Sequence, residues 1–256
     1  MEPPRQIFFY NAHGHGLSGE FHRPLKHLIE AQAGVSLPTL GGHGSSRIDN
    51  FRFNEFVSFK TAYSHVSGSW DNEHKSYTTL ATATVEGLNI LDVVTADRVV
   101  ARLSSHHRPD EDEPHITLLG SKFDNLRIAG CEIRVELNHE LFQRLDTYEA
   151  VRKEFETNPD FRKMVEDPLQ TGQPQKPPSV CGGMLCTFVK QITTTCPGVK
   201  CQGHVFIIPK FGKVYLAEIV AEYRKRTLRM LRLEMGSPLA GTMIAAETVG
   251  DGHHIP

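Results

Sequence analysis

The sequence lacks the short motifs that build the commonest catalytic sites. It contains no G-x-x-x-x-G-K-[ST] phosphate loop, no G-x-S-x-G nucleophile turn and no H-E-x-x-H zinc helix. Each motif needs a fixed spacing to bring its reactive groups together. Their absence therefore argues against nucleotide-loop enzymes, α/β-hydrolases and zinc proteases of that type.

The chain also lacks a charge excess and a long apolar run. Lys plus Arg is 28, Asp plus Glu is 30 and the formal net charge is −2, which gives no electrostatic reason for a nucleic-acid partner. No apolar run approaches the roughly 20 residues of a membrane span. The start, MEPPRQIFFYNAHG, has no apolar signal-peptide core and no cleavage site. These absences favour a cytoplasmic protein without a membrane span.

The residues that are present favour β structure. Strand-like runs, with alternating apolar positions or many β-branched side chains, occur at residues 51–70, 77–105, 115–137 and 203–256. The segment TLRMLRLEM, residues 227–235, would also fit two turns of helix. We predict a strand there because glycines bracket it at a hairpin-like spacing.

Local breaks in these runs predict turns and a bulge. The alternation of the first run slips at residues 54–55, which suggests a β-bulge. Turns are expected near residues 86–87 and 129–130, where glycine follows a strand-like segment. The segment 104–115, with two prolines and the acidic run DEDE, is expected to be an exposed loop.

One part of the chain has a helical pattern. Asn138 is a suitable N-cap, and the spacing of Leu141, Leu145 and Phe155 predicts one helix over 139–156 that buries this stripe against a sheet. A second helix should begin after Asn158, where proline occupies the first helical position.

Together these patterns predict a mainly β protein with an antiparallel, sandwich-like architecture and a two-helix insertion. We expect one β-rich domain over residues 1–256. The helical insertion at 138–167 and a proline-rich linker at 168–179 separate its two β halves. Neither half alone offers enough strands for a closed sandwich.

Histidines after the first strand are the first candidate site. His13 and His15 lie two residues apart and would face the same side of a strand, as a shared zinc ion requires. His43, also flanked by glycine, is the candidate third ligand. The alternative is a glycine-rich segment whose histidines bind no metal. We expect the alternative, with no third ligand converging.

Clustered cysteines are the second candidate site. Cys181, Cys186, Cys196 and Cys201 have the spacing C-x4-C-x9-C-x4-C, symmetric about residue 191. A hairpin between the inner pair predicts disulfides 186–196 and 181–201. A four-cysteine zinc site and free buried thiols remain open. Cys131 is expected to be a simple core residue.

Acidic residues on the predicted strands are the third candidate. Asp92, Asp97, Glu218 and Glu222 could project into a cleft, although exposed strand positions are the commoner place for such residues. The single tryptophan, Trp70, and Tyr63 could form the contact surface of a carbohydrate- or protein-binding module.

Several stretches carry a family resemblance. TATVEGLNILDVVTADRVVARL, SKFDNLRIAG and IPKFGKVYLAEIV occur in this order, with matching pieces at 83–99, 126–130 and 212–218. Together they resemble the choice-of-anchor family of β-rich bacterial surface proteins. The resemblance implies a non-enzymatic structural or surface role and an extracellular location, and it carries over no catalytic residue. The helical insertion at 138–167 departs from the family pattern.

The leading functional hypothesis is therefore a non-enzymatic, structural or self-associating β protein that forms homo-oligomers. The alternatives are a small metal-dependent hydrolase that uses His13 and His15 with zinc, and a carbohydrate- or protein-binding β module.

Overall fold

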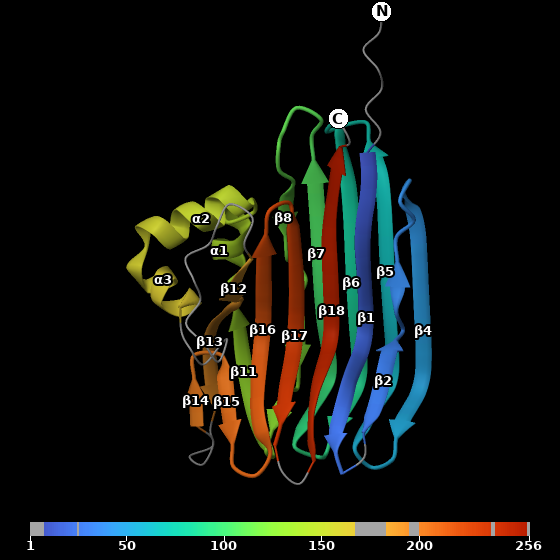
Figure 1. Cartoon of the computed structure of the whole chain (residues 1–256), viewed down its shortest axis with the longest axis vertical. Helices are drawn as coiled ribbons and strands as arrows, with labels where there is room; N and C mark the ends of the chain where they lie inside the picture. Colours follow the sequence, from blue (N-terminus) through green and yellow to red (C-terminus); the bar gives the residue numbers. More distant parts are fainter. Residues whose placement is uncertain (1–7, 25, 167–182, 195–199, 237–238, 255–256) are drawn as a thin grey trace, which may run out of the picture.

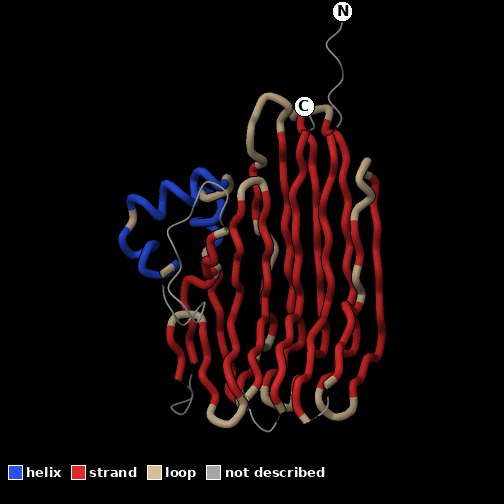
Figure 2. The backbone as a smooth tube through the Cα atoms, in the orientation of Figure 1, coloured by secondary structure: helices blue, strands red, loops and turns tan. Residues whose placement is uncertain are grey.

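Two antiparallel sheets of nine strands each make up most of the structure (Figure 1). The structure is a computed structural model that describes residues 8–24, 26–166, 183–194, 200–236 and 239–254. Figure 2 shows that strands form most of the fold and that the helices gather at one side of the sheets. The mainly β, antiparallel prediction is confirmed. No helix in the described ranges is long and apolar enough to cross a membrane.

The first sheet, sheet A, contains both ends of the described chain. Its strands follow the order β14 (Lys200–Gln202), β15 (Val205–Ile208), β16 (Gly212–Glu222), β17 (Lys225–Met235), β18 (Ala240–His254), β1 (Phe8–Arg23) and β2 (His27–Gln32). Two further strands pair beside this path, β12 (Met184–Thr187) with β16 and β3 (Val35–Ser36) with β1. The pairing of β1 with β18 joins the two β halves of the sequence.

The second sheet, sheet B, uses the middle of the chain. Its order is β13 (Val189–Thr194), β11 (Cys131–Leu137), β10 (Arg127–Ile128), β7 (Val94–His107), β6 (Ser76–Ile90), β5 (Val57–Asp71) and β4 (Gly42–Phe53). The short strands β8 (His115–Thr117) and β9 (Lys122–Asp124) also pair with β7. The main hydrophobic core draws buried side chains from both sheets, including Leu17, Val85 and Leu231.

Three short helices replace the two that the sequence predicted. They are α1 (His139–Arg144), α2 (Tyr148–Thr157) and α3 (Pro159–Val165). The expected single helix over 139–156 is wrong because α1 ends at Leu145 and the Thr147 hydroxyl caps a new helix by accepting from the Ala150 N–H. Both asparagine N-caps are confirmed. Leu145 and Phe155 are buried as predicted, whereas Leu141 is half-buried. The proline-rich segment 168–179 lies outside the described residues.

The local breaks in the strands are only partly as predicted. The turn at Ala129-Gly130 joins β10 to β11 as expected, with both residues at positive φ. The slip at residues 54–55 is the turn between β4 and β5, not a bulge. No turn occurs at Gly87, which lies inside β6 at φ 63°, and the chain reverses instead at residues 91–93.

A band of reversed alternation crosses sheet A. In each of four neighbouring strands two consecutive residues are buried, at positions 16–17, 216–217, 230–231 and 245–246. The residue pairs on either side of these positions have the same register between neighbouring strands, so the four positions lie side by side across the sheet. Ala217 and Ala246 have positive φ there. Side chains three apart, such as Arg229 and Arg232, therefore reach the same outer face.

Candidate functional site

The predicted histidine site is dispersed over two sheets. His13 and His15 lie on the outer face of β1, and His43 lies on β4 of sheet B. His15 contacts Ser18 through Nε2 at 2.7 Å and lies 3.9 Å from Glu247 through Nδ1. Burial lowers the pKa of His15, more than Glu247 raises it. Within the described ranges no three potential ligands converge on a common point, so the structure does not bring His13, His15 and His43 together.

The two aromatic candidates face opposite sides of sheet B. Tyr63 and Trp70 are both on β5, but they are seven residues apart in an unbroken register, which places them on different faces. Trp70 packs edge-on against Tyr77, 4.7 Å between ring centroids, at one end of the sandwich. They therefore cannot form one stacking platform for a sugar.

The predicted cysteine hairpin is wrong because the chain crosses between the sheets. Cys186 on β12 pairs with Ile219 of sheet A, whereas β13 pairs with β11 in sheet B. Phe188 lies between them and donates its N–H to the Ala217 carbonyl at 2.7 Å. β12 and β13 are therefore not the two arms of one hairpin.

The described thiols do not follow the disulfide prediction, and Cys186 matches the alternative of a free buried thiol. Cys186 is a buried free thiol and Cys201 an exposed free thiol, so neither forms the predicted disulfide. Burial raises the pKa of Cys186 to about 12, which keeps the thiol protonated at neutral pH. Cys131, predicted to be a simple core residue, is disulfide-bonded. Cys181 and Cys196 lie outside the described residues.

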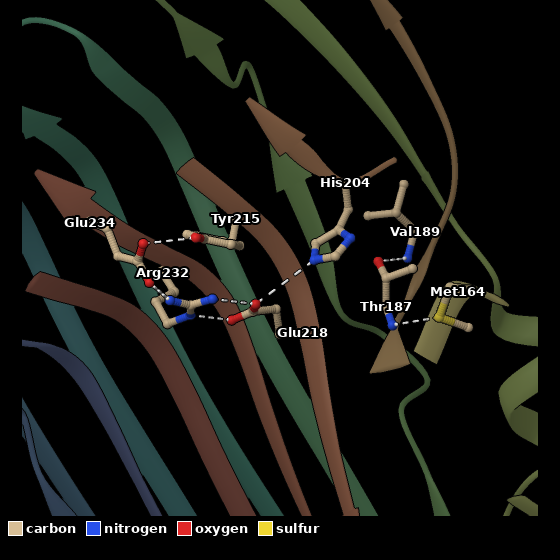
Figure 3. Close-up of polar contacts among 8 residues, drawn as sticks. All are labelled: Met164, Thr187, Val189, His204, Tyr215, Glu218, Arg232 and Glu234. Carbon is tan, nitrogen blue, oxygen red and sulfur yellow. Dashed lines mark hydrogen bonds and ion pairs between the residues drawn. The ribbon is translucent and has the colours of Figure 1, made fainter. Parts of the chain in front are cut away.

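One of the four candidate carboxylates belongs to a polar network on the outer face of sheet A. The network consists of His204, Tyr215, Glu218, Arg232 and Glu234 (Figure 3). Arg232 holds both carboxylate oxygens of Glu218, with Nε–Oε2 2.6 Å and Nη2–Oε1 2.7 Å. Its guanidinium lies over the Tyr215 ring, 3.6 Å from the centroid, and the Tyr215 hydroxyl donates to Glu234 at 2.8 Å. Glu218 is only 1% exposed, so this is a largely desolvated ion pair.

Burial and pairing with neighbouring charges act in opposite directions on the pKa of Glu218. Burial alone would raise the pKa of Glu218, but the two hydrogen bonds from Arg232, with a smaller contribution from the nearby His204 imidazole, outweigh it and hold the pKa below its usual value. Burial and the bond to Glu234 raise the pKa of Tyr215 to about 12. At neutral pH the Glu218 carboxylate is thus ionised and the Tyr215 phenol protonated. Arg232 occupies both Glu218 oxygens, which favours a structural role over proton transfer.

The lowered pKa of Glu218 predicts an acid-sensitive contribution to stability. A carboxyl with a depressed folded-state pKa stabilises the fold above its unfolded pKa and loses that contribution as pH falls through the folded value. We expect the free energy of unfolding of the wild type to exceed that of Glu218→Gln by a constant amount at neutral pH, and the gap to shrink below the ordinary carboxyl range. Urea titrations at several pH values measure it. A gap that is the same at neutral and strongly acidic pH would contradict the assignment.

The other predicted carboxylates lie elsewhere. Asp92 is in the turn after β6 and Asp97 on β7 accepts from Asn125 at 2.6 Å. Glu222 ends β16 and pairs with Lys225 at 3.2 Å. None of these three joins the network.

The acidic loop before β8 is docked rather than simply solvated. Asp112 accepts from the hydroxyl of Tyr223 and pairs with Arg224, both in the β16–β17 turn. Glu113 accepts from the Tyr148 N–H at 2.6 Å. The loop therefore links the two sheets and the start of α2, a role that its composition did not indicate.

The comparison with protein families gives one result. A family model described as Domain of unknown function (DUF8256) matches residues 8–222, from β1 to the end of β16. The chain belongs to the DUF8256 family. No curated protein and no solved structure matches it. The match includes Glu218 and Tyr215 of the network but ends before Arg232, and the resemblance to choice-of-anchor proteins stays a prediction.

Proposed function

We propose that this DUF8256 protein is a non-enzymatic, self-associating β-sandwich whose copies pair through strand β4. The observation that supports it is the edge of sheet B. β4 (Gly42–Phe53) is the last strand of that sheet and pairs only with β5 among the described strands. An unpaired strand edge offers a row of N–H and C=O groups to another chain.

β4 differs from the other outer strands in length and regularity. β2, β3, β13 and β14 have two to six residues, whereas β4 has 12. After Gly42, at φ 112°, the next positive φ in β4 is at Asn50, so residues 43–49 form an uninterrupted edge. This part contains no proline and no lysine, two devices that commonly protect edges.

The side chains of β4 favour one antiparallel register with a second copy. A two-fold axis perpendicular to the sheet and centred on Ser46 places His43 opposite Asp49, and Ser45 opposite Arg47. Centring on residue 47 would place Arg47 opposite itself, and centring on residue 45 would place His43 opposite Arg47. Because like charges directly opposite are destabilising, the register centred on residue 47 is disfavoured, and the Ser46 register is favoured because it places the hydroxyl of Ser45, not an imidazole, opposite Arg47.

Cysteine cross-linking tests this register. In a Cys201→Ser background, which removes the exposed thiol, Ser46→Cys should form a disulfide-linked dimer under mild oxidation because residue 46 faces itself across the axis. The matched control is Ser45→Cys, which meets residue 47 and lies about 7–8 Å from its own copy, beyond disulfide range. Equal cross-linking of both variants, or a monomer in sedimentation at all concentrations, would overturn the proposal.

A further inference from the structure

A groove between two incompletely paired strands lies on sheet B, far along the sheet order from β4. Among the described strands, β9 pairs with β7 alone, and β11 pairs with β10 only at Cys131 and Glu132. Beyond Glu132, the described part of β11 does not pair with β9. The resulting β9–β11 groove has a volume of about 440 Å³ and is lined by Ser121, Lys122, Phe123, Val135, Glu136, Leu137, Asn138, His139, Glu140 and Lys190.

The backbone of β11 directs hydrogen-bond donors into this groove. The Ile133 N–H donates to Leu126 at 2.9 Å on the β10 side, and the Asn138 N–H donates to Phe188 on the opposite side. Because N–H direction alternates along a strand, the Val135 and Leu137 N–H groups point the same way as that of Ile133. In the described part of the chain neither has a backbone acceptor.

A side chain at the end of the groove also lacks a partner. Nδ1 of His139 is buried and makes no hydrogen bond to any described residue. The ring is held edge-on against Phe188, 4.9 Å between centroids. Burial lowers the pKa of His139, so the imidazole is neutral at pH 7 and Nδ1 can accept or donate according to its tautomer.

The side chains that line the groove define its selectivity. Phe123, Val135 and Leu137 supply an apolar wall. The two lysines are already paired, Lys122 with Asp124 and Lys190 with Glu136, each at 2.7 Å. The groove therefore offers apolar contacts and main-chain donors without a net positive charge.

We propose that the β9–β11 groove binds an extended peptide segment of a partner protein, with alternating apolar and uncharged polar side chains, as an added strand. A peptide main chain presents carbonyl acceptors at the spacing of the Val135 and Leu137 N–H groups, and its alternate side chains reach the apolar wall. The site is independent of β4, so either surface can fail its test without affecting the other.

A capped pentapeptide of alternating threonine and valine, titrated into isotope-labelled protein, tests the proposal. The expected result is saturable shifts of the Val135, Leu137 and His139 amide signals. The same peptide N-methylated at both valines keeps every side chain but loses the donors of one edge, and should bind at least about tenfold more weakly. No shifts, or equal binding of the methylated peptide, would overturn the proposal.

Variants of the groove provide the matching protein-side control. Val135→Pro removes one groove-facing N–H without removing a bond to β13, and should weaken peptide binding about tenfold. Val135→Thr keeps the N–H and the β-branched shape and should bind as the wild type does. If Val135→Pro fails to fold, the N-methylated peptide on wild-type protein still decides. Binding by Val135→Pro at wild-type strength would contradict strand addition.

Discussion

Replacing Arg232 by methionine is expected to lower the free energy of unfolding by about 3–5 kcal/mol, the typical cost of leaving one partner of a buried ion pair alone. Glu218 is 1% exposed and receives both of its close contacts from this guanidinium. His204 Nε2, at 3.8 Å, is too distant to replace them. For a chain of this length the melting temperature should fall by about 10 °C, which thermal denaturation measures.

Two controls separate this effect from a general loss of arginine. Arg98→Met breaks a cross-strand pair with Glu86 on sheet B whose partners are 44% and 32% exposed, and it should cost at most about 1 kcal/mol. The double variant Glu218→Gln/Arg232→Met has no uncompensated charge and should recover part of the loss. If Arg232→Met were as stable as Arg98→Met, water or another group would have to stabilise the buried charge of Glu218 in place of Arg232.

The positions of most strands could be predicted from the sequence, but the band of reversed alternation across sheet A could not. Alternation and β-branched residues correctly predicted the strand at 227–235 and most of the strand structure at 51–70, where a turn at residues 54–56 separates β4 from β5. The spacing of Leu228, Met230, Leu231 and Leu233 also fitted a helix because the band reverses the alternation between residues 230 and 231. That reversal is shared by four strands from opposite ends of the chain, so a local window cannot distinguish it from helical periodicity.

The polar network could be predicted from the sequence only in part, for a related reason. Glu218 was identified as a carboxylate on a strand, but its partners come from other strands and depend on the register of β16 with β17. Tyr215 and Arg232 are direct ladder partners, and Glu218 shares their face only because of the band. The cysteine spacing misled in the opposite way, since its symmetry suggested a local hairpin whereas tertiary pairing assigns residues 186 and 189 to different sheets.

The crossing at Phe188 is the point where this tertiary pairing can be tested most directly. Phe188→Ala should lower the free energy of unfolding by about 3–5 kcal/mol, because it removes a ring that is 0% exposed. The ring packs edge-on against Phe142 of α1 at 5.5 Å, and the backbone on either side bonds to Ala217 and Asn138. The cavity therefore opens where sheet A, sheet B and the helices meet, and urea denaturation measures the loss.

A conservative and an exposed substitution set the scale for this result. Phe188→Leu keeps most of the buried volume and should cost less than about 1.5 kcal/mol. Tyr63→Ala removes an aromatic ring that is 37% exposed on the outer face of β5 and should change stability by about 0.5 kcal/mol or less. Amide exchange in α1 should accelerate in Phe188→Ala but not in Tyr63→Ala, since only the former loosens the helix contact. If Phe188→Ala were as stable as Tyr63→Ala, the chain would not cross between the sheets at residue 188, and the hairpin that the cysteine spacing suggested would regain its support.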